Sequence, residues 1–165
     1  MAKKQKSLCR NGVHFGTNFP HNDEVIPYLE EHGNLPFELM PFQEEVIKSF
    51  ADEFRVGIYA DVGTGKTIMA IALHKYKRAS RGSRALVIMP PILLHQWAAT
   101  LRKTGEDSIV IYAGTPAQRK ALSLDAEWIL VGMEIFKLDF ERIYTELDPH
   151  RLTVIVDEEE KKKNP

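Results

Sequence analysis

The run from Ala60 to Thr67 (ADVGTGKT) combines two glycines with a lysine and a threonine, the residue types that hold a nucleotide phosphate. Gly63 and Gly65 allow the backbone to curl so that successive N–H groups face an anion. An apolar stretch precedes this run and an amphipathic one follows it, which is the strand–loop–helix context that a phosphate loop requires. The dipole of a helix that begins near Lys66 adds positive potential. The sequence therefore predicts a phosphate-binding loop, with an incidental glycine-rich turn as the alternative.

Each residue of this loop has an expected role. Lys66 is expected to reach the β- and γ-phosphates of ATP and to serve catalysis, and Thr67 to coordinate Mg²⁺. Gly63, Thr64 and Gly65 are expected to bind the phosphates through their backbone N–H groups. The predicted cofactors are therefore ATP and Mg²⁺.

Two acidic residues, Asp157 and Glu158, directly follow the apolar run Val154–Val156. A carboxylate at the end of a strand can hold Mg²⁺, and its neighbour can polarise the attacking water as a general base. An acidic surface loop is the alternative, because such residues are common after strands. Their position downstream of a phosphate loop favours the functional interpretation. We expect Asp157 to bind Mg²⁺, through water, and Glu158 to act as the base.

A glutamine, Gln43, lies on a predicted helix ahead of the phosphate loop. A side-chain amide donates and accepts hydrogen bonds at once, so it can recognise the edge of adenine. For an isolated glutamine, a solvated helix residue is the better interpretation. The adenine-binding role depends on the family resemblance described below.

Apolar runs and amphipathic runs alternate along most of the chain. This alternation predicts an α/β fold with a mostly parallel sheet and helices on both faces. Residues 1–20 lack periodicity and are expected to form a tail or an accessory loop. The predicted strands are Val56–Ala60, Ala85–Met89, Ile109–Tyr112, Trp128–Val131 and Leu152–Val156. Helices are predicted from Pro41, over Lys66–Tyr76 and Leu93–Arg102, after a cap at Thr115-Pro116, and up to Ile143.

The composition limits the class of protein. A chain of 165 residues with 44% hydrophobic residues has room for one domain with one core. A single cysteine excludes an intramolecular disulfide framework and fits a reducing compartment. Neither a membrane-spanning run nor an apolar signal core after the first residues is evident, so we expect a cytoplasmic protein, or a nuclear one in a eukaryote, with no membrane partner.

The balanced net charge of −1 conceals a basic segment. No acidic residue occurs between Val62 and Gly105, whereas eight basic residues do: Lys66, Lys75, Lys77, Arg78, Arg81, Arg84, Arg102 and Lys103. Such a segment beside a nucleotide site suggests contact with a nucleic-acid backbone. For the four cations near the predicted helix end, a solvated helix terminus is the favoured alternative.

Taken in order, these motifs resemble the first RecA-like lobe of superfamily-two helicases, and Swi/Snf-type ATP-dependent DNA translocases most closely. The corresponding segments are Leu39–Phe50 (Q motif), Asp61–Thr67 (motif I), Ala85–Trp97 (Ia), Ile109–Arg119, Ile129–Asp139 (Ib, with Glu134 and Asp139) and Val154–Pro165 (II). The set is more specific than any single motif. The resemblance implies residues 1–35 as an N-terminal accessory segment and residues 36–165 as a partial helicase ATP-binding domain.

The resemblance also implies a mechanism. ATP would bind between two RecA-like lobes, with Gln43 reading adenine and the second lobe supplying arginine fingers. Motifs Ia and Ib would grip nucleic acid, expected to be double-stranded DNA, and ATP hydrolysis would move the protein along it.

Two departures from the family pattern stand out. Motif II continues Glu159-Glu160, where the family has a small residue and then His, Asp or Gln. No motif III or second lobe follows, so we expect a truncated lobe whose sheet is incomplete at the C-terminus. The chain alone is then expected to be inactive and poorly stable.

Two other functions remain open from the sequence. A nucleotide-binding lobe that does not hydrolyse ATP alone, and that acts with a separate second-lobe subunit, would use the same residues. A small P-loop kinase is disfavoured, because Gln43 precedes the loop and no lid-like arginine-rich segment follows.

Overall fold

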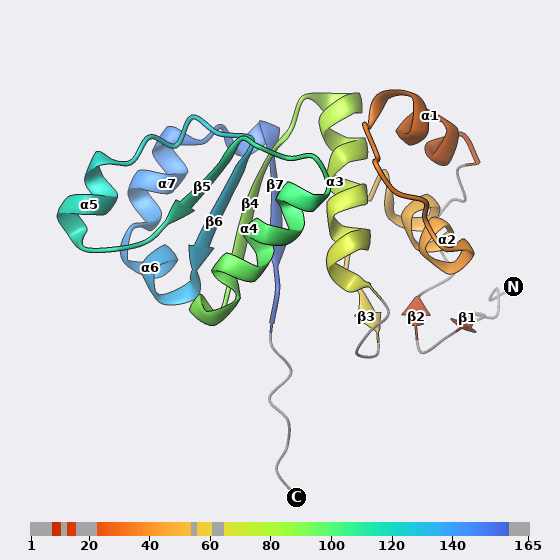
Figure 1. Ribbon diagram of the computed structural model, residues 1–165, viewed down its shortest axis with the longest axis horizontal. Coiled ribbons are helices and arrows are strands. Elements are labelled where there is room, and N and C mark those ends of the chain that lie inside the picture. The colour runs from red at the N-terminus through yellow and green to blue at the C-terminus, as the bar shows by residue number, and fades with distance from the viewer. Residues whose placement is uncertain (1–7, 11–12, 16–22, 54–55, 61–64, 159–165) are drawn as a thin grey trace, which may run out of the picture. The chain divides into compact units, whose positions relative to one another are not determined.

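The computed structural model describes residues 8–10, 13–15, 23–53, 56–60 and 65–158 (Figure 1). The chain folds into two compact units, residues 1–80 and 81–165. The first unit carries the phosphate-loop helix, and the second carries the parallel sheet. No helix in the described ranges is both long enough and apolar enough to cross a membrane.

Three helices form the core of the first unit: α1 (Val25–His32), α2 (Pro41–Phe50) and α3 (Lys66–Arg81). Pro41 occupies the first position of α2, as predicted, where its missing N–H has no intrahelical partner to lose. One cluster joins the three helices through Leu29, Ile47 and Ala72, each fully buried. The helix α3 ends at Arg81, five residues beyond its expected end at Tyr76.

The N-terminal segment, expected to be a tail or an accessory loop over residues 1–20, contains two short paired strands. Strands β1 (Leu8–Arg10) and β2 (Val13–Phe15) pair antiparallel, and β2 also pairs antiparallel with β3 (Tyr59–Ala60). The predicted strand Val56–Ala60 is therefore shorter than expected, and it does not join the parallel sheet. Its backbone groups need partners, and β2 supplies them.

The second unit contains a four-stranded parallel sheet in the order β5-β6-β4-β7, as the alternating pattern predicted. The strands are β4 (Arg84–Met89), β5 (Ile109–Tyr112), β6 (Trp128–Gly132) and β7 (Leu152–Val156). Strands β4 and β6 are buried along nearly their whole length, as expected where both faces of a sheet are covered.

Helices of the second unit cover this sheet. They are α4 (Leu94–Lys103), α5 (Pro116–Ala121), α6 (Met133–Leu138) and α7 (Phe140–Glu146), with 3₁₀ turns at Pro91–Leu93 and Pro149–Arg151. Leu86 and Ile88 of β4 pack in one cluster with Ile143 of α7. The alternate β4 residues, such as Val87, are equally buried, and α4 lies in front of the sheet (Figure 1).

The last strand, β7, forms one edge of the sheet. It pairs in parallel with β4, and its other side has no strand partner among the described residues. Val154 and Val156 are each 52% exposed on this strand. The sheet thus has an open edge at β7, and the expected poor stability of the chain stays a prediction.

Candidate functional site

Gln43 is buried at the start of α2, with 4% of its surface exposed. Its Oε1 accepts a hydrogen bond from the backbone N–H of Met40 at 3.0 Å, which satisfies a donor at the helix terminus. The alternative interpretation, in which Gln43 is a solvated residue on the helix surface, is therefore excluded.

The amide of Gln43 lies directly against the end of the phosphate loop. A Cβ atom added to Gly65 would lie 2.6 Å from Gln43 Nε2, which is closer than real contacts allow. Gly65 also has a φ of +78°, a conformation that side chains disfavour. The backbone conformation favours glycine here, and an added side chain would displace the end of Gln43. The structure thus brings together two residues predicted to bind the nucleotide.

Lys66 and Thr67 are the first two residues of α3, as the phosphate-loop pattern predicts. The backbone N–H of Met69 donates to the carbonyl of Gly65 at 3.0 Å, so the helical turn begins directly at the loop. A helix N-terminus of this kind presents unpaired N–H groups and positive potential to an anion. Gly63 and Thr64 lie outside the described residues.

The second unit carries the predicted motif II carboxylates at the end of β7. The backbone N–H of Asp157 donates to the carbonyl of Ile88 at 2.9 Å, which extends the pairing with β4 by one residue. The side chain of Glu158 is exposed, and Glu159 and Glu160 lie outside the described part of the chain. The phosphate loop belongs to the first unit and these carboxylates belong to the second.

Trp97 makes a contact that the sequence did not reveal. Its indole Nε1 donates to Asp157 Oδ2 at 2.7 Å, although 60 positions separate the two residues. The side chain is also packed in the core, with 3% of its surface exposed. Its place after Gln96, in the segment that resembles motif Ia, was the available signal.

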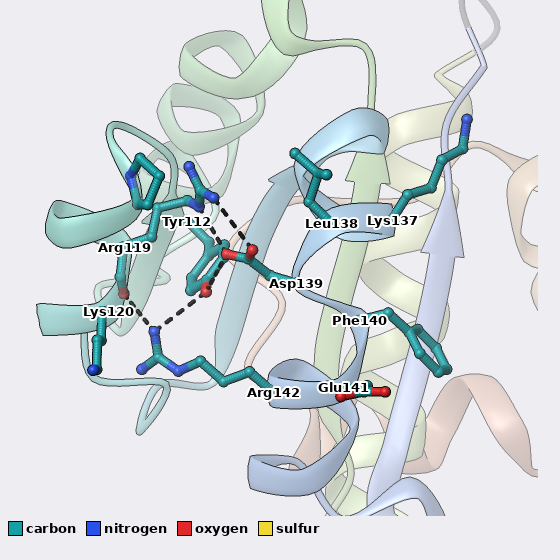
Figure 2. Close-up of a pocket in the computed structure, with 10 residues that line it drawn as sticks. Tyr112, Arg119, Lys120, Lys137, Leu138, Asp139, Phe140, Glu141 and Arg142 are labelled. Atoms are coloured by element: carbon teal, nitrogen blue, oxygen red, sulfur yellow. Dashed lines mark hydrogen bonds and ion pairs between the residues drawn. The ribbon is translucent and has the colours of Figure 1, made fainter.

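A polar network links the segments that resemble motif Ib and the strand before it (Figure 2). Arg119 donates to both oxygens of Asp139, with Nε–Oδ2 at 2.7 Å and Nη2–Oδ1 at 3.2 Å. Tyr112 donates its hydroxyl to Asp139 Oδ2 at 2.8 Å, and Arg142 Nη1 lies 3.2 Å from the same hydroxyl. These groups line a cavity of about 570 Å³ whose wall also contains Lys120.

The network fixes the ionisation of its members. The hydrogen bond from Arg119 is the main reason why the pKa of Asp139 lies below its usual value, and the bond from Tyr112 adds to it. Burial, followed by the hydrogen bond to Asp139, raises the pKa of Tyr112. Asp139 is therefore an ionised carboxylate whose two oxygens are occupied by protein donors.

Several cations of the basic segment have structural partners. Lys75 is fully buried and donates to the carbonyl of Asn34 at 2.8 Å. Lys77 donates to the carbonyls of Ala51 and Glu53, each at 3.0 Å. The expectation of solvated lysines at a helix end was thus wrong for Lys75, because it lies inside α3 and its buried ammonium donates to the Asn34 carbonyl.

Metal-binding clusters give no further candidate. In the ranges that the structure describes, no group of three or more His, Cys, Asp or Glu side chains could hold a metal ion. A single carboxylate with a threonine hydroxyl is nevertheless the sparse set that Mg²⁺ uses beside nucleotide phosphates. Thr67 and Asp157 fit this set by residue type and by their places at a helix start and a strand end.

The fold is similar to that of a solved ATPase core. A structure titled Sulfolobus solfataricus SWI2/SNF2 ATPase core in complex with dsDNA matches with a TM-score of 0.57 and 19% identity. The match covers 74% of this chain and 32% of that chain. It confirms the predicted RecA-like α/β fold.

Curated proteins are also similar to this chain in sequence. The RNA polymerase-associated protein RapA of Pseudomonas savastanoi is 29% identical over 111 residues, and that of Pseudomonas putida is 31% identical over 87 residues. The first match covers 59% of this chain but 12% of RapA, so the chain spans a small part of the length of these relatives.

The profile of the DEAD/DEAH box helicases matches residues 40–163. This range holds both halves of the predicted site, from Gln43 through the phosphate loop to Asp157 and Glu158. The predicted resemblance to superfamily-two helicases of the Swi/Snf type is therefore confirmed, and the chain belongs to the DEAD/DEAH box helicase family.

Proposed function

We propose that this chain is the ATP-binding lobe of an ATP-dependent translocase that moves on double-stranded DNA. In this proposal Gln43 reads adenine, Lys66 binds the β- and γ-phosphates, and Thr67 and Asp157 hold Mg²⁺. Glu158 accepts the proton of the attacking water. A bound Mg²⁺ would neutralise the charge that develops on the phosphates.

The packing of Gln43 against Gly65 at the start of α3 is the observation that carries the proposal. It places an amide with hydrogen-bonding capacity beside backbone N–H groups suited to a phosphate. The positive φ of Gly65 suits a glycine at the point where the loop enters the helix.

The partners in this proposal are a second RecA-like lobe and duplex DNA, and the expected location is the cytoplasm. The Sulfolobus protein was solved with dsDNA, which supports duplex DNA over RNA. Because no second lobe is among the described residues, the 165-residue chain alone is expected to bind ATP with little or no turnover. The family match lends no support to a small kinase.

ATP titration of the wild-type chain and of Lys66→Ala tests the site, with and without DNA. Lys66→Ala is expected to abolish ATP binding, because it removes the charge that meets the phosphates. Lys103→Ala is the matched control for ATP binding without DNA, since Lys103 is an exposed lysine at the end of α4. Equal ATP affinity in wild type and Lys66→Ala would show that the site is wrongly placed.

ATP turnover separates the two nucleotide-binding functions. A DNA-stimulated ATPase rate from the pure chain would exclude a lobe that depends on a separate second-lobe subunit. Binding without turnover, followed by turnover when the second lobe is supplied, would support the dependence.

A further inference from the structure

We propose that Trp97 is a positioning residue for Mg²⁺, whose indole N–H holds one oxygen of Asp157 so that the other oxygen meets the cation. This inference rests on the proposed function, in which Asp157 is a metal ligand. It adds a residue on α4 to the part of the proposed site that the second unit carries at the end of β7.

Two contacts hold Asp157 from neighbouring elements. Its backbone is tied to β4 by the 2.9 Å bond to Ile88, and its side chain is tied to α4 by the 2.7 Å bond from Trp97. The chain runs from β4 through a 3₁₀ turn into α4, so both contacts come from one continuous segment. Hydrogen bonds therefore hold both the backbone and the side chain of Asp157 in place.

The donor chemistry of the indole suits a ligand that must keep its charge. An indole N–H is neutral and is a donor only, so it orients a carboxylate without neutralising it. It occupies Oδ2, and the proposal gives Oδ1 of Asp157 to the cation. Groups that hydrogen-bond to a metal ligand, without touching the metal themselves, commonly set the orientation of that ligand.

Asp139 shows the opposite arrangement in the same unit. Arg119 and Tyr112 donate to its Oδ2, and Arg119 also donates to its Oδ1. Both oxygens are thus occupied, and a guanidinium compensates the charge. Among the described residues, by contrast, the side chain of Asp157 accepts a hydrogen bond at Oδ2 from Trp97, and the proposal assigns its Oδ1 to the cation.

The second tryptophan of the chain provides a matched control. Trp128 is fully buried, and its indole donates to Glu106 Oε2 at 2.9 Å. The bond has the same chemistry as that of Trp97, but Glu106 lies in no motif of the predicted site. Each tryptophan can therefore be studied alone, as Trp97 in Trp128→Phe and as Trp128 in Trp97→Phe.

The test measures ADP binding with Mg²⁺ and with EDTA, together with tryptophan emission. We expect Trp97→Phe to lower the Mg²⁺ affinity of the ADP-bound chain by about 10- to 100-fold, the usual effect of losing such a partner. ADP affinity in EDTA should not change. A general loss of structure would lower this affinity as well, so the comparison separates the two causes. Trp128→Phe should leave both affinities as in wild type.

Emission gives a second readout that does not depend on turnover. In Trp128→Phe, the emission of Trp97 should change with Mg²⁺ and ADP but not with ADP in EDTA. If Trp128→Phe does not fold, Asp157→Asn in the wild-type background replaces it, and the Mg²⁺-dependent change in emission should be lost. Circular dichroism melts establish that each variant is folded.

The outcomes of this test separate the inference from the proposed function. Mg²⁺-dependent ADP binding in wild type, with an unchanged Mg²⁺ affinity in Trp97→Phe, overturns the inference and leaves the proposed function intact. Failure of the folded wild-type chain to bind ADP at all overturns the proposed function and, with it, the inference.

Discussion

Replacement of Gly65 by alanine tests the geometry on which the nucleotide site is built. The left-handed backbone at φ +78° costs an alanine about 1–2 kcal/mol. The new Cβ would also meet Gln43 Nε2 at 2.6 Å, so the amide must move. Loss of its bond to Met40 adds about 1 kcal/mol. Gly65→Ala should therefore lower the free energy of unfolding by about 2–3 kcal/mol.

Gly105→Ala is the matched control for the backbone contribution. Gly105 has a φ of +81°, and a Cβ added there meets nothing within 4 Å. It should cost only the conformational part, about 1–2 kcal/mol. Urea unfolding of the two variants, followed by circular dichroism, measures the difference.

A double-mutant cycle with Gln43→Ala isolates the contact itself. In the Gln43→Ala background, Gly65→Ala should cost no more than Gly105→Ala, because the obstructing amide is gone. If Gly65→Ala instead costs no more than Gly105→Ala in the wild-type background, Gln43 does not pack against the loop. The argument for a joint adenine and phosphate site would then fail.

Three further predictions concern the second unit and the basic segment. Asp139→Asn should lower the free energy of unfolding by about 2 kcal/mol at pH 7, through loss of the charged bonds from Arg119. Because the pKa of Asp139 is lowered in the folded state, this difference should persist above the unfolded pKa of about 3.9 and vanish as pH falls through the folded value. Trp128→Phe leaves the buried Glu106 without its 2.9 Å donor and should cost about 1–3 kcal/mol in urea unfolding. Lys75→Ala should cost about 2–4 kcal/mol, yet leave the salt dependence of DNA binding unchanged, because its ammonium is buried on Asn34.

Each of these predictions has a result that would contradict it. An Asp139→Asn deficit that stays constant down to pH 2 would show that its charge is not involved. A neutral Trp128→Phe would mean that Glu106 finds another donor at no cost. A reduced salt slope in Lys75→Ala would place that lysine on DNA after all.

The parallel sheet was predictable because local signals and long-range pairing agree there. Continuous apolar runs suit a sheet with both faces covered, as β4 and β6 show. The strands Ile109–Tyr112 and Leu152–Val156 also have the predicted bounds. The start of α3 was equally clear, since glycines followed by lysine mark both a loop and a helix terminus.

The N-terminal hairpin and the partners of β3 could not be predicted in this way. Three-residue strands such as Leu8–Arg10 are too short to show a period, and the second of them, β2, pairs with a strand more than 40 residues away. The pairing of Tyr59 with His14 is a tertiary choice that no local pattern records.

The polar contacts of the candidate site could not be predicted from local sequence patterns either. Gln43 and Asp157 were predicted by residue type, but the partners that orient them were not. Trp97 donates across 60 positions, and periodicity assigns a buried indole to packing before it assigns a hydrogen bond. Side-chain polar contacts depend on rotamers and register, which the sequence pattern does not encode.

The open edge of β7 affects how the chain can be handled in solution. Among the described residues, the outer side of β7 has no strand partner, and such an edge is a template for pairing with other copies of the chain. Solubility is therefore expected to fall steeply with protein concentration, and turbidity should appear before the chain unfolds. A lysine introduced at Val154 would place a charge on this edge and should keep concentrated samples clear.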